Sequence, residues 1–205
     1  MNREQIEQIA RSVMLDCKTH KEREPGWIFY HGLRTARIAE DICSLLDLNI
    51  DGDVLFTGAL FHDIGKGSKP HNIVGAELTG KLLGTHFDEE ELDRICEIVR
   101  LHNQRNNGHE YSLEVRVVQD ADLLDHVGPI NSWLAFYWSG THNETIEDHV
   151  SFITSEETEQ ERERLRSQLN FDVSVRMYDE RILWEDRFFE TFRNVYFEGV
   201  WHSAE

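Results

Sequence analysis

Apolar residues recur along this chain at intervals of three and four positions, the spacing of one face of an α-helix. The periodic segments do not alternate apolar and polar residues as strands do, and the prolines Pro25, Pro70 and Pro129 all lie between them. The pattern therefore predicts an all-α fold, with helices at about residues 2–19, 27–47, 52–63, 71–85, 89–103, 111–126, 129–138, 145–168 and 174–199.

One predicted helix is apolar on every side. The segment Val54 to Phe61 has no polar face, which is typical of a helix buried all round, and Asp51 or Asp53 can cap its start. We expect this helix to be central. Two aromatic groups nearer the C-terminus are interpreted as core, although the first could instead cover a site or stack on a base. They are Trp133, Phe136, Tyr137 and Trp138, and then Phe188, Phe192, Val195 and Tyr196.

Length and charge limit the class of protein. A chain of 205 residues with 40% apolar residues can bury one sizeable core, so we expect a single domain over residues 1–205. Its 21 basic and 39 acidic residues give a net charge of −18, which disfavours binding to duplex nucleic acid or to an anionic membrane.

The apolar runs are far shorter than the roughly 20 residues of a membrane span, and the N-terminus lacks a signal-peptide pattern. We therefore expect a cytoplasmic protein.

The cysteines give no sign of a metal or redox pair. Cys17, Cys43 and Cys96 are odd in number and widely spaced, so we interpret them as reduced core residues.

Polar residues occupy positions where the helical period calls for a core residue. His102 continues the apolar face of its helix, as does Asp122 on the helix that follows, while His31 and His71 share the apolar faces of two earlier helices. The buried helix itself ends in the adjacent pair His62 and Asp63. Burying such a group without a hydrogen-bond partner destabilises the fold by about 1–3 kcal/mol.

A hydrogen bond can satisfy any one of these side chains. Four imidazoles and two carboxylates on the inward faces of five helices, however, need a common compensating charge. A divalent transition metal supplies that charge and prefers these ligand types. The pattern therefore indicates a metal site.

The same residues carry a resemblance to a known family. The order His31, then His62-Asp63, then Asp122 resembles the H…HD…D signature of the HD-domain metal-dependent phosphohydrolase superfamily. The strings ALFHDIGKG, HNIVGAEL, IVRLHN and VVQDADLLDHVG are similar to that family over about residues 25–130. The resemblance implies a compact helical bundle, with C-terminal helices packing on the metal-binding core.

The resemblance also implies the ligands. His31, His62, Asp63 and Asp122 match the four signature ligands, and His71 and His102 match two further histidines of members with a two-metal site. Asp63 would then bridge the two ions, which we expect to be Fe or Mn, with Ni, Co, Zn or Mg as alternatives.

Asp122 matches the family better than Asp120 does. The family's aspartate stands in an Ala-Asp pair before a leucine-containing turn, and the helical period places Asp122, but not Asp120, on the apolar face. Two departures leave the substrate open. Leu123 stands where many members have a basic residue, and the absence of a following Gly-Tyr-Pro motif disfavours the cyclic-dinucleotide phosphodiesterases.

The implied reaction is hydrolysis of a phosphomonoester or phosphodiester in a small phosphorylated metabolite or nucleotide. Metal-activated water is the nucleophile, and we expect Lys66, Asp63 and Asp125 to take part in catalysis. Lys66 and Arg34 are candidate phosphate contacts, although either could be an ordinary surface residue. Asp125 or His126 could orient a ligand or move a proton, with an ordinary helix-end residue as the simpler interpretation of His126.

The remaining histidines follow no apolar face and are expected to be solvated: His20, His86, His109, His142, His149 and His202.

Two other functions are compatible with parts of the pattern. Some proteins that resemble this six-ligand set use two irons to activate oxygen, so a di-iron oxygenase is one alternative. A non-catalytic nucleotide-binding module is another, which the intact ligand set disfavours. The expected partner is a small phosphorylated substrate, and a homo-oligomer is compatible with the sequence.

Overall fold

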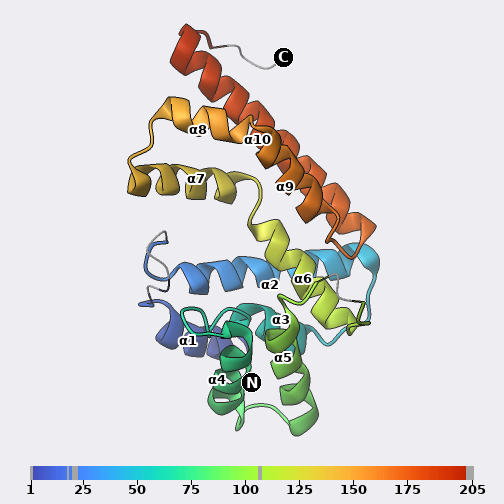
Figure 1. The fold of residues 1–205 in the computed structure, drawn as a ribbon. Helices are drawn as coiled ribbons and strands as arrows, with labels where there is room; N and C mark the ends of the chain where they lie inside the picture. Colours follow the sequence, from blue (N-terminus) through green and yellow to red (C-terminus); the bar gives the residue numbers. More distant parts are fainter. Residues whose placement is uncertain (1, 18, 20–22, 106–107, 202–205) are drawn as a thin grey trace.

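A computed structural model describes residues 2–17, 19, 23–105 and 108–201. These residues form ten α-helices and no β-strand, so the all-α prediction is confirmed (Figure 1). The helices are α1 (Arg3–Met14), α2 (Trp27–Leu46), α3 (Gly52–Phe61), α4 (His71–Leu83), α5 (Glu89–Leu101), α6 (Leu113–Asp125), α7 (Pro129–His142), α8 (Ile146–Ile153), α9 (Glu156–Arg166) and α10 (Asp172–Glu198).

Helix α3 lies at the centre of the N-terminal half. It packs against α2 and α5, while α2 also packs along α6 and α4 along α5. Every residue from Val54 to Phe61 is buried, as the sequence predicts. The Asp51 carboxylate caps the helix by accepting hydrogen bonds from the backbone N–H groups of Asp53 and Val54, at 3.0 and 3.2 Å. The apolar core of the protein is thus built around the helix that ends at His62 and Asp63.

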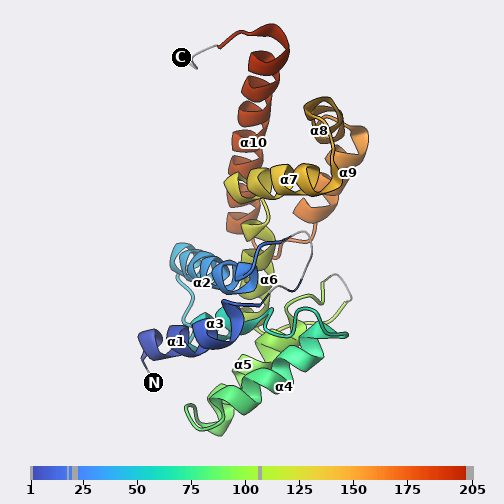
Figure 2. The same ribbon diagram turned by 90° about the vertical axis from the view of Figure 1, so that its left-hand side faces the viewer.

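Helices α7 to α10 form a second layer over α2 and α6. In both views this layer lies on one side of the bundle, with α10 running through it (Figures 1 and 2). Helix α10 contacts α2, α6 and α7, and α8 packs on α9. The chain passes directly from the end of α6 into α7, so the layer starts at the point where Asp122 and Asp125 lie.

Buried polar contacts fix α10 to α6. The Asp120 carboxylate accepts hydrogen bonds from the backbone N–H groups of Asn170 (2.8 Å) and Phe171 (3.2 Å) just before α10 begins. Burial raises the pKa of Asp120, and these hydrogen bonds partly oppose the rise. One turn further along α6, Arg181 donates to the carbonyl of Leu124. The C-terminal end of α6 is therefore tightly held.

The burial of Asp120 corrects one expectation. The helical period placed it off the apolar face, yet it is as buried as the core residues. The reason is that α10 covers a second face of α6, which the periodicity of α6 alone does not reveal.

Several helix boundaries also differ from the prediction, and α7 runs to His142 instead of ending at residue 138. Helix α1 ends at Met14 instead of continuing to residue 19. The helix predicted over 145–168 is two helices, because Ser155 leaves the helical conformation and its hydroxyl accepts a hydrogen bond from the backbone N–H of Thr158 at 3.2 Å. A serine N-cap inside a uniformly polar run produces no break in hydrophobic periodicity.

Several residues expected in the core are exposed. Cys17 is exposed beyond the end of α1, and Val195 and Tyr196 are exposed near the end of α10. Trp133 and Trp138 are 51% and 45% exposed, although the sequence analysis favoured core packing for them. These helices pack on only one side, so an aromatic residue on the other side stays exposed.

The opposite error occurs at His149, which was expected to be solvated. It is buried, with its ring 5.4 and 5.5 Å from those of Phe136 and Phe189. The short helix α8 brings it there.

None of the helices in the described part of the chain combines the length and the apolar composition that a membrane span requires.

A glycine allows α2 and α3 to approach each other. A Cβ atom on Gly32 would overlap with the backbone carbonyl oxygen of Leu60. This close contact lies next to His31 on α2 and near His62 at the end of α3, whose rings are 4.8 Å apart between centroids. Any larger residue at position 32 would force the two helices apart.

We predict that Gly32→Ala destabilises the protein by about 2–3 kcal/mol, because the clash involves backbone and cannot be relieved by a side-chain rotation. Gly140→Ala is the matched control, since a Cβ there meets nothing within 4 Å. In an exposed helix interior that change should stabilise by up to about 1 kcal/mol. Urea denaturation of both variants measures the difference, and equal stabilities would contradict the close-approach argument.

Candidate metal centre

Three donor atoms meet where α2, α3 and α6 converge. The Nε2 atoms of His31 and His62 are 3.1 Å apart, and Asp122 Oδ1 lies 3.2 Å from the first and 3.6 Å from the second. His31 is on α2, His62 is the C-cap of α3, and Asp122 is in the last turn of α6. Residues 91 positions apart in the sequence thus present their donor atoms to one point.

A second group of donors lies beside the first. His71 begins α4 and His102 is the C-cap of α5. Their Nε2 atoms are 3.3 Å apart and lie 3.6 and 3.5 Å from Asp63 Oδ1.

Asp63 belongs to both groups. Its Oδ1 faces His71 and His102, whereas its Oδ2 lies 3.9 Å from the Nε2 atoms of His31 and His62. The structure therefore brings together all six side chains that the sequence singled out as ligands. It arranges them as two groups that share one carboxylate.

Hydrogen bonds behind the rings fix which nitrogen faces inward. The Nδ1 atom of His62 lies 2.7 Å from the carbonyl oxygen of Ala59, and that of His102 lies 2.8 Å from the carbonyl of Val99. A carbonyl oxygen can only accept, so each Nδ1 carries a proton and each neutral ring presents an unprotonated Nε2. The Nδ1 atom of His31 is oriented in the same way by Asp125 Oδ2, at 2.7 Å.

This tautomer makes the cluster suited to a cation. Two unprotonated Nε2 atoms at 3.1 Å, in His31 and His62, cannot hydrogen-bond to each other, and both are fully buried. A proton or a metal ion must lie between them. Imidazole nitrogens backed by carbonyls and carboxylates are the usual ligands of divalent transition metals. The donor set therefore fits such an ion.

The electrostatics of the first group are dominated by its carboxylates. Burial by itself lowers the pKa of His31, but hydrogen bonds and charge from Asp122 and Asp125 outweigh it and raise the pKa to about 9. Burial would raise the pKa of Asp122, yet the imidazoles of His31 and His62 that face it hold it well below its ordinary value. In the metal-free chain His31 therefore keeps a proton at neutral pH, in the position that a metal ion would take.

The second group behaves differently. Burial lowers the pKa of His71, and the positive charge of Lys66 lowers it further. Burial pushes the pKa of the Asp63 carboxyl upward, but the imidazoles around it and the positive charge of Lys66 hold that pKa well below its ordinary value. Asp63 is thus ionised at neutral pH and offers both oxygens.

Two basic side chains that the sequence singled out contact the carboxylates. Arg34 donates two hydrogen bonds to Asp125, at 2.7 and 2.9 Å, and Lys66 Nζ lies 3.0 Å from Asp63 Oδ2. Arg34 therefore has a partner inside the protein that the sequence did not indicate, and its contact with substrate stays a prediction. Asp125 lies behind His31, where it orients the ring.

Arg105 was missed by the sequence analysis. Its guanidinium donates to Asp122 Oδ2 at 2.8 Å and to the carbonyl of Gln119 at 2.7 Å. It comes from the loop after α5, where no periodicity marks a residue as inward-facing. An arginine three residues after a candidate ligand was the only signal available.

A cavity of about 360 Å³ opens over Asp63. Lys66 lines it, as the sequence analysis expected of a residue near the substrate. His126 lines it as well, with Nε2 3.8 Å from Asp122 Oδ1, so it is more than an ordinary helix-end residue. The other lining residues are Arg23, Trp27, Ile28 and Trp138.

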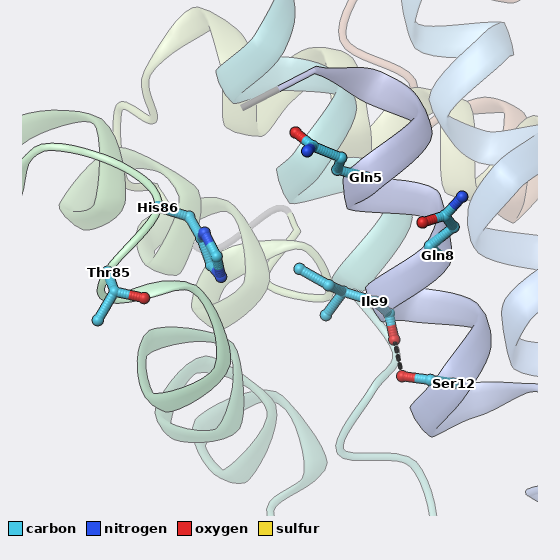
Figure 3. Close-up of a pocket in the computed structure, with 6 residues that line it drawn as sticks. All are labelled: Gln5, Gln8, Ile9, Ser12, Thr85 and His86. Carbon is cyan, nitrogen blue, oxygen red and sulfur yellow. Dashed lines mark hydrogen bonds between the residues drawn. The ribbon is translucent and has the colours of Figure 1, made fainter.

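A second cavity, of about 480 Å³, lies elsewhere, between α1 and the end of α4 (Figure 3). Its lining residues are Gln5, Gln8, Ile9, Ser12, Thr85 and His86. It contains none of the six clustered side chains, so the smaller cavity is the candidate site. The other histidines expected to be solvated divide as follows: His86, His109 and His142 are exposed, and His20 and His202 lie outside the described residues.

Comparison with known proteins agrees with this geometry. Residues 28–126 match the model of the HD domain family, a range that includes all six clustered residues. It lies inside the 25–130 stretch on which the resemblance rests. No curated protein matches the chain in sequence.

Solved structures share the fold. YpgQ from Bacillus subtilis, in complex with ADP, is 20% identical with a TM-score of 0.65, over 94% of this chain and 97% of YpgQ. An HD-superfamily hydrolase from Bacillus thuringiensis is 20% identical with a TM-score of 0.66, over 95% and 97% of the two chains. The Lin1889 protein from Listeria innocua is 20% identical with a TM-score of 0.61, over 94% and 96%.

At these identities the structural likeness establishes the fold, and the sequence match establishes the domain within it. The chain therefore contains a domain of the HD family, at residues 28–126.

Proposed function

We propose that this chain is a metal-dependent phosphohydrolase that acts on a small phosphorylated metabolite or nucleotide. The observation that carries the proposal is the position of Asp63, which is shared by two groups of metal-ligand side chains and also lines a cavity with the cationic Lys66. Divalent-cation donors beside a basic side chain suit a phosphate group, because both parts attract its negative oxygens.

The two groups suggest two ions. His31, His62 and Asp122 would hold one, His71 and His102 the other, with Asp63 between them; we propose Fe or Mn, as the sequence analysis expected. Such ions lower the pKa of bound water toward about 7 and so supply hydroxide at neutral pH. Asp125 and Arg105 keep His31 and Asp122 in place through the hydrogen bonds described above.

Size and charge support a small anionic substrate. A cavity of about 360 Å³ is within the roughly 300–1,000 Å³ of small-molecule sites. The net charge of −18 repels anions at a distance, so local cations must attract the phosphate. YpgQ, with the same fold, is in complex with ADP, which supports a nucleotide as substrate here.

Anaerobic and aerobic assays of Mn- and Fe-loaded protein against a panel of phosphoesters test the proposal. We expect phosphate or pyrophosphate release without oxygen. If the iron form consumes oxygen and releases no phosphate, the di-iron oxygenase is the better assignment. Binding of a nucleotide with no turnover under any metal would instead favour the non-catalytic module.

Titration of the metal-free protein with Mn²⁺ should give two ions per chain. We predict that His71→Ala removes one of them, because His71 contacts only the second group, whereas Asp63→Ala weakens both. His86→Ala is the control, since that histidine is exposed and remote from the cluster. A stoichiometry of one in the wild-type chain, unchanged in His71→Ala, would contradict the two-ion site.

The same titration should release protons. In the metal-free chain the pKa of His31 is about 9, above its ordinary 6.5, so the proton stabilises the fold below pH 6.5 and that contribution is lost as the pH rises through 9. Because a metal ligand must be unprotonated, binding at pH 7.5 should displace this proton. Calorimetry in buffers of different ionisation enthalpy measures the release, which should disappear above pH 10.

We predict that Lys66→Ala lowers kcat/KM for a phosphoester by about 10- to 150-fold, the effect of losing a charge-assisted hydrogen bond of about 1.5–3 kcal/mol. Metal content should stay the same and is measured alongside. Lys69→Ala is the matched control, because Lys69 is exposed in the same loop and does not line the cavity. Unchanged kinetics in Lys66→Ala would mean that Lys66 only forms an ion pair with Asp63 and does not contact the substrate.

A further inference from the structure

Trp138 stands at the cavity over Asp63, although it comes from the C-terminal layer. It lies near the end of α7 and lines the same cavity as Asp63 and Lys66. Its side chain is 45% exposed. A large apolar ring left half exposed next to a charged site loses the free energy of burial, so its position there calls for an explanation.

Neighbouring side chains hold the indole ring in place. It stacks on His142, with centroids 3.8 Å apart and planes 16° from parallel. Its Nε1–H donates to Glu144 Oε1 at 3.2 Å, and the other oxygen of Glu144 accepts a hydrogen bond from the Ser139 hydroxyl at 2.9 Å. Ser139 in turn lies 3.1 Å from Nδ1 of the buried His149. The ring is therefore fixed before any ligand arrives.

The other tryptophan that lines the cavity, Trp27, is covered by other side chains of the protein. The guanidinium groups of Arg23 and Arg34 lie over the ring of Trp27 at 5.4 and 5.1 Å, and His31 stacks on it at 6.0 Å. Among the described residues, only the ring of His142 stacks on Trp138. Of the two tryptophans, Trp138 is therefore the one with exposed ring surface that can receive a flat ligand.

The cavity thus has two chemically different kinds of lining. Its lining includes the charged Lys66 and Asp63, where a phosphate would meet the metal centre, and also the aromatic indole of Trp138. We infer that Trp138 forms a subsite for a planar aromatic ring of the substrate, such as a nucleobase, and so determines specificity for aromatic over ring-free phosphoesters. This inference rests on the proposed function for the position of the phosphate. Stacking of this kind accepts any flat base, because every base has a π-face.

Equilibrium binding of ADP and of inorganic pyrophosphate to the Mn-loaded protein tests the subsite. The two ligands share a diphosphate and differ in the adenosine. The wild-type protein should bind ADP more tightly than pyrophosphate. Trp138→Ala should raise the Kd of ADP about 5- to 150-fold, the range measured when an aromatic residue that stacks on a base is removed, and change that of pyrophosphate less than about twofold.

Further variants separate stacking from bulk and from folding defects. Trp138→Phe keeps a ring and should retain most of the ADP affinity, whereas Trp138→Leu keeps apolar volume without a ring and should behave like Trp138→Ala. Trp133→Ala is the matched control, because Trp133 is 51% exposed on the same helix and does not line the cavity. It should leave both affinities unchanged.

The inference and the proposed function can fail separately. Equal loss of ADP and pyrophosphate affinity in Trp138→Ala, no loss of either, or wild-type protein that binds ADP no more tightly than pyrophosphate would each overturn the ring subsite. None of these results depends on turnover. Absence of phosphoester hydrolysis with Trp138-dependent ADP binding would overturn the proposed function and leave the subsite in place.

Discussion

The buried carboxylate of Asp63 is the constraint on which this structure depends. It is 4% exposed and lies within 4 Å of imidazole nitrogens from four histidines. A buried charge is stable only when compensated, so the surrounding helices must deliver partners to it with little freedom. Lys66 approaches from the loop that follows, and the imidazoles come from the ends or inner faces of α2, α3, α4 and α5.

A further set of contacts holds those partners in position. Gly32 lets α2 and α3 come close enough for His31 and His62 to meet. Asp125 orients His31, and Arg105 restrains Asp122. Each contact sacrifices conformational freedom or apolar burial at one point to fix a donor atom at another, which is how preorganised sites are generally built.

The C-terminal layer is anchored to the helix that carries Asp122 and supplies one residue of the cavity lining. Helix α10 is attached to α6 through Asp120 and Arg181, and Glu185 accepts a hydrogen bond from the backbone N–H of Gly128 at 2.6 Å, just before α7. Burial raises the pKa of Glu185, and the hydrogen bonds it receives oppose that rise. Because α7 starts at this anchored turn, the ring of Trp138 near its other end has a defined position relative to Asp63.

The sequence by itself determined the helical class, the central position of residues 54–61 and the six clustered donors, because polar residues on apolar helix faces interrupt a regular period. It could not reveal Arg105, the burial of Asp120 or the exposure of Trp138. Periodicity records which face of a helix is apolar but not which helix will cover it, nor where an irregular loop will pass. Those facts arise only when α10 covers α6 and the loop after α5 returns to Asp122, so the tertiary structure alone decided them.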